Sequence, residues 1–315
     1  MSNKIRLENG MLSAEIRLPG SEPESERFDS SCVVEQVVLH GKHRFCQPEQ
    51  LLPDRVTCYG FGLCAEYDMN DIGREASRGE LFPKPGVGLL TQIEDGKPYD
   101  MWSHYEIQRY RKTWQYGADW YSCTEEPQEC RGIALEIKRN LQLKENRILL
   151  ETEIRNKGKR RAVFSEYHHN FVSLDDLRAG EGYCLEIPFD GTIADLPKSF
   201  RRRSTFEPIP ESSVRVEGQR IIWTDDMEDD RTYHKTTREE NILSCPEYRW
   251  TLKHRDSAAS VSETTGFRPW RIVLWGIEHC ICTEVYHKID LEPGAVDRYI
   301  RTWQFDDEET GEKKA

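Results

Sequence analysis

The sequence predicts an all-β fold, a large antiparallel β-sandwich. Short runs with strand patterning recur along its 315 residues with turn residues between them, and long segments with helical periodicity are missing. No internal repeat and no proline-rich linker divides the chain, and large all-β folds reach this length without splitting. We therefore expect residues 1–315 to form a single domain.

The predicted strands follow one another in order, several of them in pairs around turn residues. The runs 5–7 and 13–18 flank Asn9-Gly10, a dipeptide that favours a tight hairpin. The run 147–155, RILLETEIR, alternates apolar and charged residues as a half-buried strand does. The polar stretch 66–80 is expected to be loop. The remaining predicted strands are 32–39, 133–143, 213–216, 220–223, 271–275, 280–289 and 297–305.

Charge and hydropathy exclude several functional classes. The net charge of −12 argues against nucleic acid or an anionic membrane as the main partner. No window approaches 18 uninterrupted apolar residues, so no transmembrane helix is expected. The first residues lack the apolar stretch of a signal peptide, which predicts a cytoplasmic protein. The sequence does not indicate an oligomeric state.

The ten cysteines are scattered and form no C-x-x-C motif, so we expect reduced thiols packed as small apolar groups. Cys280 and Cys282 next to His279 are the one pattern worth testing as a metal site. On a strand the two thiols share a face while His279 points away, and no second ligand pair completes a tetrahedron. We therefore predict no metal.

The stretch 162–175, AVFSEYHHNFVSLD, carries the most unusual chemistry of the chain. Because successive side chains on a strand point to opposite faces, only one of its two adjacent histidines can point into a given cavity. Glu166 and Asn170 share a face with His168 and could satisfy it by hydrogen bonds. The opposite face carries Val163, Ser165, Tyr167, His169 and Phe171.

A second strand places Glu284 on a face with small thiols and Tyr286, which fits the wall of a cleft. A glutamate in this position could equally be paired with Lys288 or with an arginine of a neighbouring strand. The residues by themselves leave both interpretations open.

Several segments together resemble the galactose mutarotase-like superfamily, the aldose 1-epimerases and their uncharacterised relatives. The resemblance spans roughly residues 3 to 305. It is carried by Arg27-Phe-Asp29, Gly60-Phe-Gly-Leu63 with Glu66, Gly79-Glu-Leu-Phe-Pro-Lys84-Pro-Gly-Val-Gly88, Glu166-Tyr-His-His-Asn-Phe171, Cys282-Thr-Glu-Val-Tyr286, Leu291-Glu-Pro-Gly294 and Arg301-Thr-Trp-Gln-Phe305.

The resemblance implies a mutarotase-like supersandwich with an open cleft for a sugar ring, and an isomerase that interconverts anomers without a cofactor. By motif position it places the general acid on His169 and the general base on Glu284, and His168 remains the alternative acid. Catalysis requires His169 and Glu284 to face one another across a sugar-sized gap, and we expect the structure to show it.

The chemistry suits these residue types. Ring opening of a pyranose needs a proton delivered to the ring oxygen and one removed from the anomeric hydroxyl. An imidazole with a reference pKa of about 6.5 can carry or release a proton near neutrality, and a carboxylate with a reference pKa of about 4.3 can accept one.

A sugar site also needs polar side chains and an aromatic surface, because a pyranose has an apolar face and a ring of hydroxyls. Two other functions remain open: a non-catalytic carbohydrate-binding protein on the same fold, and a hexose-phosphate 1-epimerase. The second requires residues 198–203, KSFRRR, to put at least two arginines at the cleft rim. The candidate substrate-binding residues are Arg27, Glu66, Arg74, Lys84, His104 and Tyr286, with Trp102 and Trp275 as further stacking surfaces.

Overall fold

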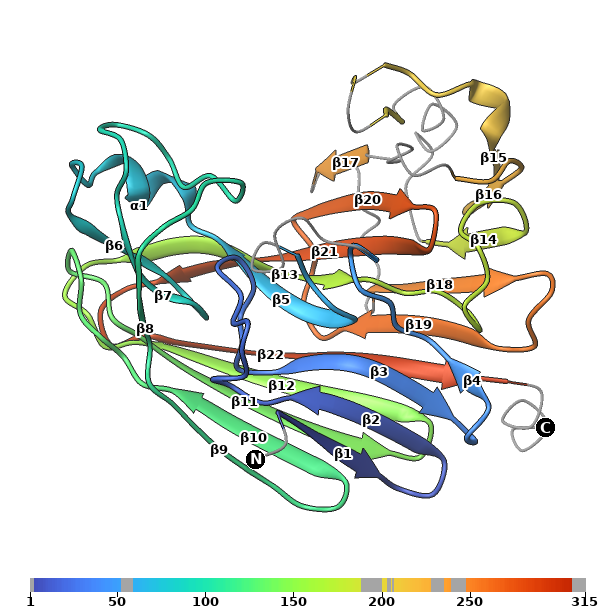
Figure 1. Ribbon diagram of the computed structural model, residues 1–315, viewed down its shortest axis with the longest axis horizontal. Helices are drawn as coiled ribbons and strands as arrows, with labels where there is room; N and C mark the ends of the chain where they lie inside the picture. Colours follow the sequence, from blue (N-terminus) through green and yellow to red (C-terminus); the bar gives the residue numbers. More distant parts are fainter. Residues whose placement is uncertain are drawn as a thin grey trace.

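Two large antiparallel sheets pack against each other in the computed structural model (Figure 1). The structure describes residues 3–51, 59–187, 200–202, 205, 207–227, 235–238 and 248–307. The first sheet has the order β1-β2-β3-β5-β13-β21-β20-β17, and β4 pairs with β3. Its strands are β1 (Lys4–Glu8), β2 (Leu12–Arg17), β3 (Val33–Leu39), β4 (His43–Arg44), β5 (Leu63–Asp68), β13 (Ala162–Asn170), β17 (Lys235–Arg238), β20 (Arg271–Ile277) and β21 (Cys280–Leu291).

The second sheet has the order β15-β16-β14-β18-β19-β22-β12-β11-β10-β9. Its inward side chains and those of the first sheet form one large core, as alternating strand residues on facing sheets do. The strands are β9 (Lys112–Tyr116), β10 (Trp120–Glu125), β11 (Leu135–Lys144), β12 (Arg147–Asn156), β14 (Tyr183–Glu186), β15 (Val214–Glu217), β16 (Arg220–Trp223), β18 (Tyr248–His254), β19 (Ser260–Thr265) and β22 (Val296–Asp306).

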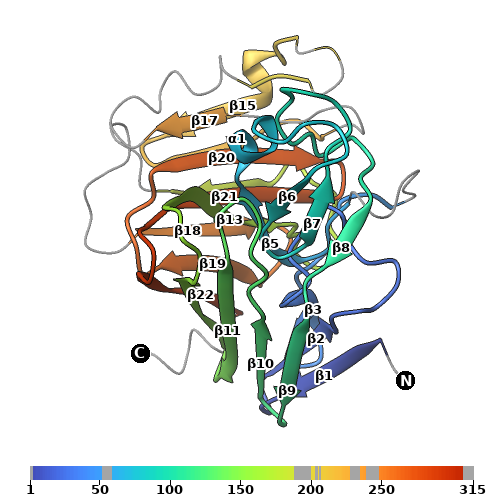
Figure 2. The same cartoon turned by 90° about the vertical axis from the view of Figure 1, so that its left-hand side faces the viewer.

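A smaller group of elements covers one end of β13 and β21 (Figure 2). It consists of the short helix α1 (Asn70–Arg74) and a three-stranded sheet of β6 (Leu81–Lys84), β7 (Gly88–Thr91) and β8 (Ile107–Arg109). A second apolar cluster, which includes Ile72, Phe82 and Phe164, holds this group against β13. A short 3₁₀ helix spans Glu211–Ser213.

The expected antiparallel β-sandwich is confirmed, and the predicted hairpin at 5–18 appears as β1–β2. The predicted strands 133–143 and 147–155 pair with each other as β11 and β12. The expectation of loop over 66–80 is wrong at its start, because β5 extends to Asp68 and α1 follows it. Strand β5 lies between β3 and β13 and is buried along nearly its whole length. Pairing on both edges therefore holds Glu66 in a strand despite its polarity.

The inner face of β13 carries a buried polar network between the two sheets. Arg301 on β22 donates to Glu166 at 2.7 Å and to Glu263 at 2.6 Å. The Nδ1 atom of His168 lies 2.8 Å from a carboxylate oxygen of Glu166. Burial lowers the pKa of His168 to about 4, so this imidazole is neutral at physiological pH. The predicted contact of His168 with Glu166 is confirmed, and it holds His168 inside the sandwich.

Three further observations concern the described ranges only. None of their helices has the length and apolar character needed to cross a membrane. All eight cysteines that they contain are free. They bring no three histidine, cysteine, aspartate or glutamate side chains into a metal-binding group.

Candidate active site

Four neighbouring strands place a row of polar and aromatic side chains on the outer face of the first sheet. Glu66 on β5 pairs in register with Tyr167 on β13, Tyr167 pairs with Tyr286 on β21, and Tyr286 pairs with Arg271 on β20. Residues at paired register positions point to the same side of a sheet, with Cβ atoms about 5 Å apart. The two tyrosine rings accordingly stack, with centroids 4.3 Å apart.

The next row along the same face contains His169 and Glu284. The register that pairs Tyr167 with Tyr286 is kept as far as the bridge between Val172 and Ile281, so His169 lies directly opposite Glu284. The Nε2 atom of His169 is 3.0 Å from Oε1 of Glu284. The structure thus differs from the expected gap between them, because the two residues are cross-strand neighbours that lie side by side.

Aromatic rings hold the His169 imidazole in place. Its ring stacks on Phe171 with centroids 3.9 Å apart and planes 9° apart, and Trp275 meets it edge-on at 5.4 Å. The Phe28 ring approaches it edge-on at 6.0 Å. Trp275, expected as a surface for a sugar, therefore packs against the histidine. The imidazole can rotate little without losing these contacts, so the direction of Nε2 toward Glu284 is fixed.

Burial controls the protonation of Glu284, whose residue is only 5% exposed. Desolvation raises the pKa of Glu284 to about 8, against the opposing effects of the Arg27 charge and of the hydrogen bond that Tyr286 donates at 3.1 Å. A carboxyl group with this pKa is protonated at neutral pH. Together, His169 and Glu284 thus hold at least one proton near neutrality.

A buried charge cluster supports the first row from one side. Arg27 donates through Nε to Glu66 at 2.6 Å, and its NH1 lies 3.4 Å from both carboxylate oxygens of Glu49. Lys84 lies 3.4 Å from Glu66, which also accepts a hydrogen bond from the Tyr167 hydroxyl. Although burial opposes ionisation, Arg27 and Lys84 keep the pKa of Glu66 below its ordinary value. Glu66 therefore stays an anion.

A cavity of about 280 Å³ opens over the first row. Arg271 lies in its wall with the guanidinium 4.8 Å from the centre of the Tyr286 ring. The Nε atom of Arg271 is buried and has no hydrogen-bond partner in the described part of the chain. The walls of this cavity are formed by Glu66, Asp68, Tyr99, Asp100, Met101, Trp102, Tyr167, Arg271 and Tyr286.

The structure brings some of the predicted substrate-binding residues together and leaves others apart. Arg27, Glu66, Lys84 and Tyr286 join the site, and Trp102 lines the cavity. Two others lie elsewhere, and both have largely exposed side chains. Arg74 on α1 pairs with Asp71, and His104 contacts Glu26. Arg201 and Arg202 of the predicted arginine run do not line the cavity, and residues 198, 199 and 203 of that run lie outside the described residues.

Sequence reasoning missed Glu49, Asp68, Tyr167 and Arg271. Tyr167 could have been found by parity, since it shares a strand face with His169. Arg271 opens a strand that the sequence predicted, but its position beside Tyr286 depends on register. No pattern in the sequence around Glu49 indicates that its side chain belongs to the site.

Comparison with known proteins identifies the fold. Neither a protein-family model nor a curated protein sequence matches the chain. Among solved structures, the Slr1438 protein of Synechocystis sp. PCC 6803 superposes with a TM-score of 0.57 and 14% identity over 98% of this chain and 97% of its own. The galactose mutarotase related enzyme of Lactobacillus acidophilus gives 0.53 and 13% identity over 96% and 97%. The chain has the galactose mutarotase-like fold.

A protein of Escherichia coli K12 with a provisional aldose 1-epimerase assignment gives a TM-score of 0.58 at 9% identity, over 96% of this chain and 99% of its own. The galactose mutarotase-like fold thus extends over nearly the whole chain, as the sequence resemblance implied. At these identities the likeness concerns the fold, and the chemistry must be argued from the side chains.

Proposed function

We propose that this protein is an aldose 1-epimerase-like isomerase that interconverts the anomers of a sugar by ring opening. One observation carries the proposal: His169 and Glu284 meet at 3.0 Å on the sheet face that also walls a cavity of about 280 Å³. A buried imidazole and carboxyl in contact form an acid–base pair, and perturbed carboxyl groups of this kind concentrate at functional sites. Structural neighbours described as mutarotase-related or as an aldose 1-epimerase support the same reaction class.

The reaction needs one acid and one base at the same moment. The 3.0 Å contact lets the proton of Glu284 pass to Nε2 of His169, which leaves a carboxylate beside an imidazolium. Glu284 then removes the proton of the anomeric hydroxyl while His169 protonates the ring oxygen. The bond from the anomeric carbon to the ring oxygen breaks and an open-chain aldehyde forms. Rotation about the neighbouring bond and reversal of both proton transfers give the other anomer.

The side-by-side position of the two groups suits this substrate. The anomeric hydroxyl and the ring oxygen are bonded to the same carbon, so their two proton-transfer partners must also be close neighbours. Positioned acid and base groups typically contribute on the order of 10²–10⁴-fold each. The sugar oxygens take the place of the direct contact, so the Glu284 carboxyl turns away while the aromatic neighbours of His169 keep the direction of its Nε2.

Side chains of the cavity wall would bind the rest of the ring. Arg271 offers nitrogen donors to sugar hydroxyls, and Trp102 together with Tyr286 supplies aromatic surface for its apolar face. Arg27 and Lys84 act indirectly, because they position Glu66 as a hydrogen-bond acceptor in the cavity wall. Among the described residues that line this cavity, Arg271 is the only arginine, which disfavours a phosphorylated sugar.

The experiment is anomer-exchange spectroscopy on a panel of aldoses, with wild type beside His169→Asn and Glu284→Gln. We expect exchange above the buffer rate for at least one sugar, and a loss of at least 100-fold in each variant. Glu80→Gln, a change at an exposed surface glutamate, is the matched control and should keep wild-type activity. Full activity in Glu284→Gln would remove Glu284 from the mechanism.

A non-catalytic carbohydrate-binding protein is the second candidate. Its support is the close contact and deep burial of His169 and Glu284, which are 3% and 5% exposed. Calorimetric titration separates the two functions. Sugar binding without any acceleration of anomer exchange would establish the binding protein and refute the isomerase.

A further inference from the structure

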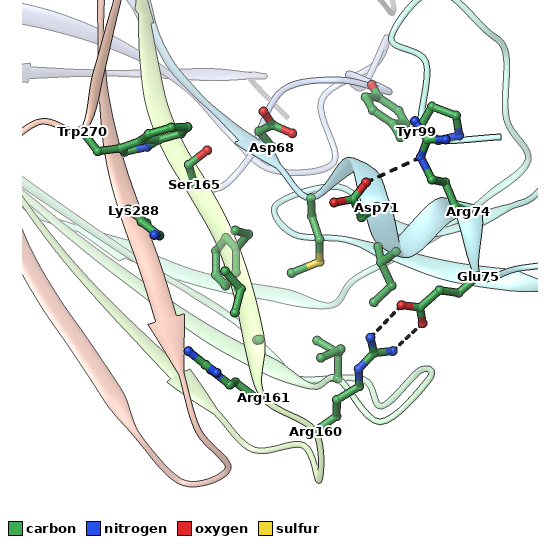
Figure 3. Close-up of a pocket in the computed structure, with 17 residues that line it drawn as sticks. Asp68, Asp71, Arg74, Glu75, Tyr99, Arg160, Arg161, Ser165, Trp270 and Lys288 are labelled. Atoms are coloured by element: carbon green, nitrogen blue, oxygen red, sulfur yellow. Dashed lines mark hydrogen bonds and ion pairs between the residues drawn. The ribbon is translucent and has the colours of Figure 1, made fainter. Parts of the chain in front are cut away.

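A second and larger cavity lies beside the candidate active site. It has a volume of about 760 Å³ and runs between α1 and the strands β13 and β21 (Figure 3). Trp270, Ser165 and Asp68 gather along one side of it, and the ion pair of Arg160 with Glu75 lies at the far end. We call it the outer groove.

The outer groove adjoins the smaller cavity. Asp68 and Tyr99 line both of them. Trp270 of the outer groove meets the Tyr286 ring edge-on, with centroids 6.3 Å apart, and Tyr286 in turn lines the smaller cavity and donates to Glu284. His169 and Glu284 do not line the smaller cavity themselves, and Tyr286 connects them to it. A molecule in the smaller cavity would therefore border the outer groove at Asp68 and Tyr99.

The charges of the outer groove largely cancel. Its arginines are paired with acids: Arg160 with Glu75, Arg161 with Asp290, and Arg74 with Asp71. Exposed pairs of this kind leave little net field, so a polyanion such as nucleic acid or a polyphosphate finds no concentrated positive surface. A neutral polar ligand fits this wall better.

Trp270 points to the class of that neutral ligand. The indole is half-buried at the groove wall, and its Nε1 atom is buried without a hydrogen-bond partner among the described residues. Because this nitrogen is closed to solvent, the exposed part of the ring is what a ligand in the outer groove can contact. Ser165, Lys288 and Asp68 add a hydroxyl, an ammonium and a carboxylate nearby. An aromatic platform with dispersed donors and acceptors is the surface that a further sugar ring requires.

We propose that the substrate is the reducing end of a disaccharide or longer saccharide, with its reducing ring in the smaller cavity and the following rings in the outer groove. The inference rests on the proposed function and names its substrate class. The smaller cavity, about 280 Å³, lies at the lower end of the usual size range of small-molecule sites, and the adjoining larger one, about 760 Å³, lies well within it and exceeds what one ring needs. The glycosidic link stays intact, and only the bond from the anomeric carbon to the ring oxygen of the reducing ring breaks and re-forms.

The test compares anomer exchange of glucose and galactose with that of maltose, cellobiose and lactose, each at several concentrations. We expect kcat/KM for at least one disaccharide to exceed that of its reducing-end monosaccharide by about tenfold, the order of one aromatic contact. Trp270→Ala should remove that advantage and leave the monosaccharide rate unchanged. Trp114→Ala, at an exposed tryptophan on β9 that does not line either cavity, is the control and should change neither rate.

Loss of the Trp270 ring could also disturb its neighbour Tyr286, so a second variant that leaves Trp270 in place is needed. Val163 lies on the groove wall with 52% of its surface exposed, so Val163→Arg should fold and fill the outer groove. It should lower disaccharide turnover to the monosaccharide level. If monosaccharides are exchanged, disaccharides are no better, and neither variant separates the two, the outer groove has no role and the proposed function stands.

If no sugar is exchanged, the proposed function fails and binding decides the inference. Maltotriose titration followed by tryptophan fluorescence should then show saturable binding that Trp270→Ala and Val163→Arg weaken at least tenfold and Trp114→Ala does not. Absence of binding, or equal binding by all four proteins, would refute the outer groove as a saccharide site.

Discussion

Replacement of Glu284 by glutamine tests the electrostatics of the site independently of catalysis. The amide has the shape of the protonated carboxyl and can keep the contacts with His169 and Tyr286, but it cannot ionise. In the folded protein, burial raises the pKa of Glu284 from an ordinary value of 4.5 to about 8. The unfolded chain exposes this carboxyl and restores its ordinary pKa.

The sign follows from proton binding. Between about pH 4.5 and pH 8 the folded state holds the proton of Glu284 and the unfolded state has released it. Wild-type stability therefore falls relative to Glu284→Gln by about 1.4 kcal/mol per pH unit over this interval. The variant should gain about 2 kcal/mol over wild type at pH 6, and the gain should level off at about 5 kcal/mol above pH 8.

Urea denaturation followed by tryptophan fluorescence at pH 4.5, 6, 7.5 and 9 measures this difference. The two proteins should have nearly equal free energies of unfolding at pH 4.5 and diverge steadily above it. A difference that stays constant within about 0.5 kcal/mol over the whole range would refute the raised pKa of Glu284. A variant that becomes less stable than wild type as pH rises would show that the fold stabilises the carboxylate and lowers the pKa of Glu284.

Three further outcomes are expected. The value of kcat/KM for wild type should fall above about pH 8, where Glu284 loses the proton that it shares with His169, and Glu284→Gln should not show this fall. A wild-type profile that stays flat to about pH 10 would contradict a mechanism in which the pair holds one proton. Arg27→Met removes the buried cation that Glu66 and Glu49 share and leaves only Lys84 beside Glu66, so it should lower the free energy of unfolding by about 3–5 kcal/mol. A loss below about 1 kcal/mol in urea denaturation would mean that the cluster relaxes. Gly62→Ala should also destabilise the protein, by roughly 1–3 kcal/mol, because Gly62 has a φ of +52° and an added Cβ would collide with a backbone carbonyl of β3; an unchanged thermal midpoint would contradict this.

Strand parity determined much of the candidate site from local sequence. The alternation of side chains along 162–175 separated His168 from His169, and the structure places them on opposite faces of β13. The same argument put Glu284 and Tyr286 on one face of β21, where Tyr286 donates a hydrogen bond to Glu284. Parity is local because it follows from the backbone geometry of a single extended strand.

Register and burial came only from the tertiary structure. The sequence does not specify that β21 pairs with β13 so that Glu284 meets His169, or that Arg271 on β20 lies beside Tyr286. Those pairings join residues more than a hundred positions apart or depend on which strands become neighbours, and no local pattern records that choice. For the same reason the sequence predicted a gap between His169 and Glu284, where the structure has a direct contact. The sequence predicted His169 and Glu284 as the candidate pair and assigned each to a strand face. The packing of four strands decided that the two side chains meet and that burial raises the pKa of Glu284.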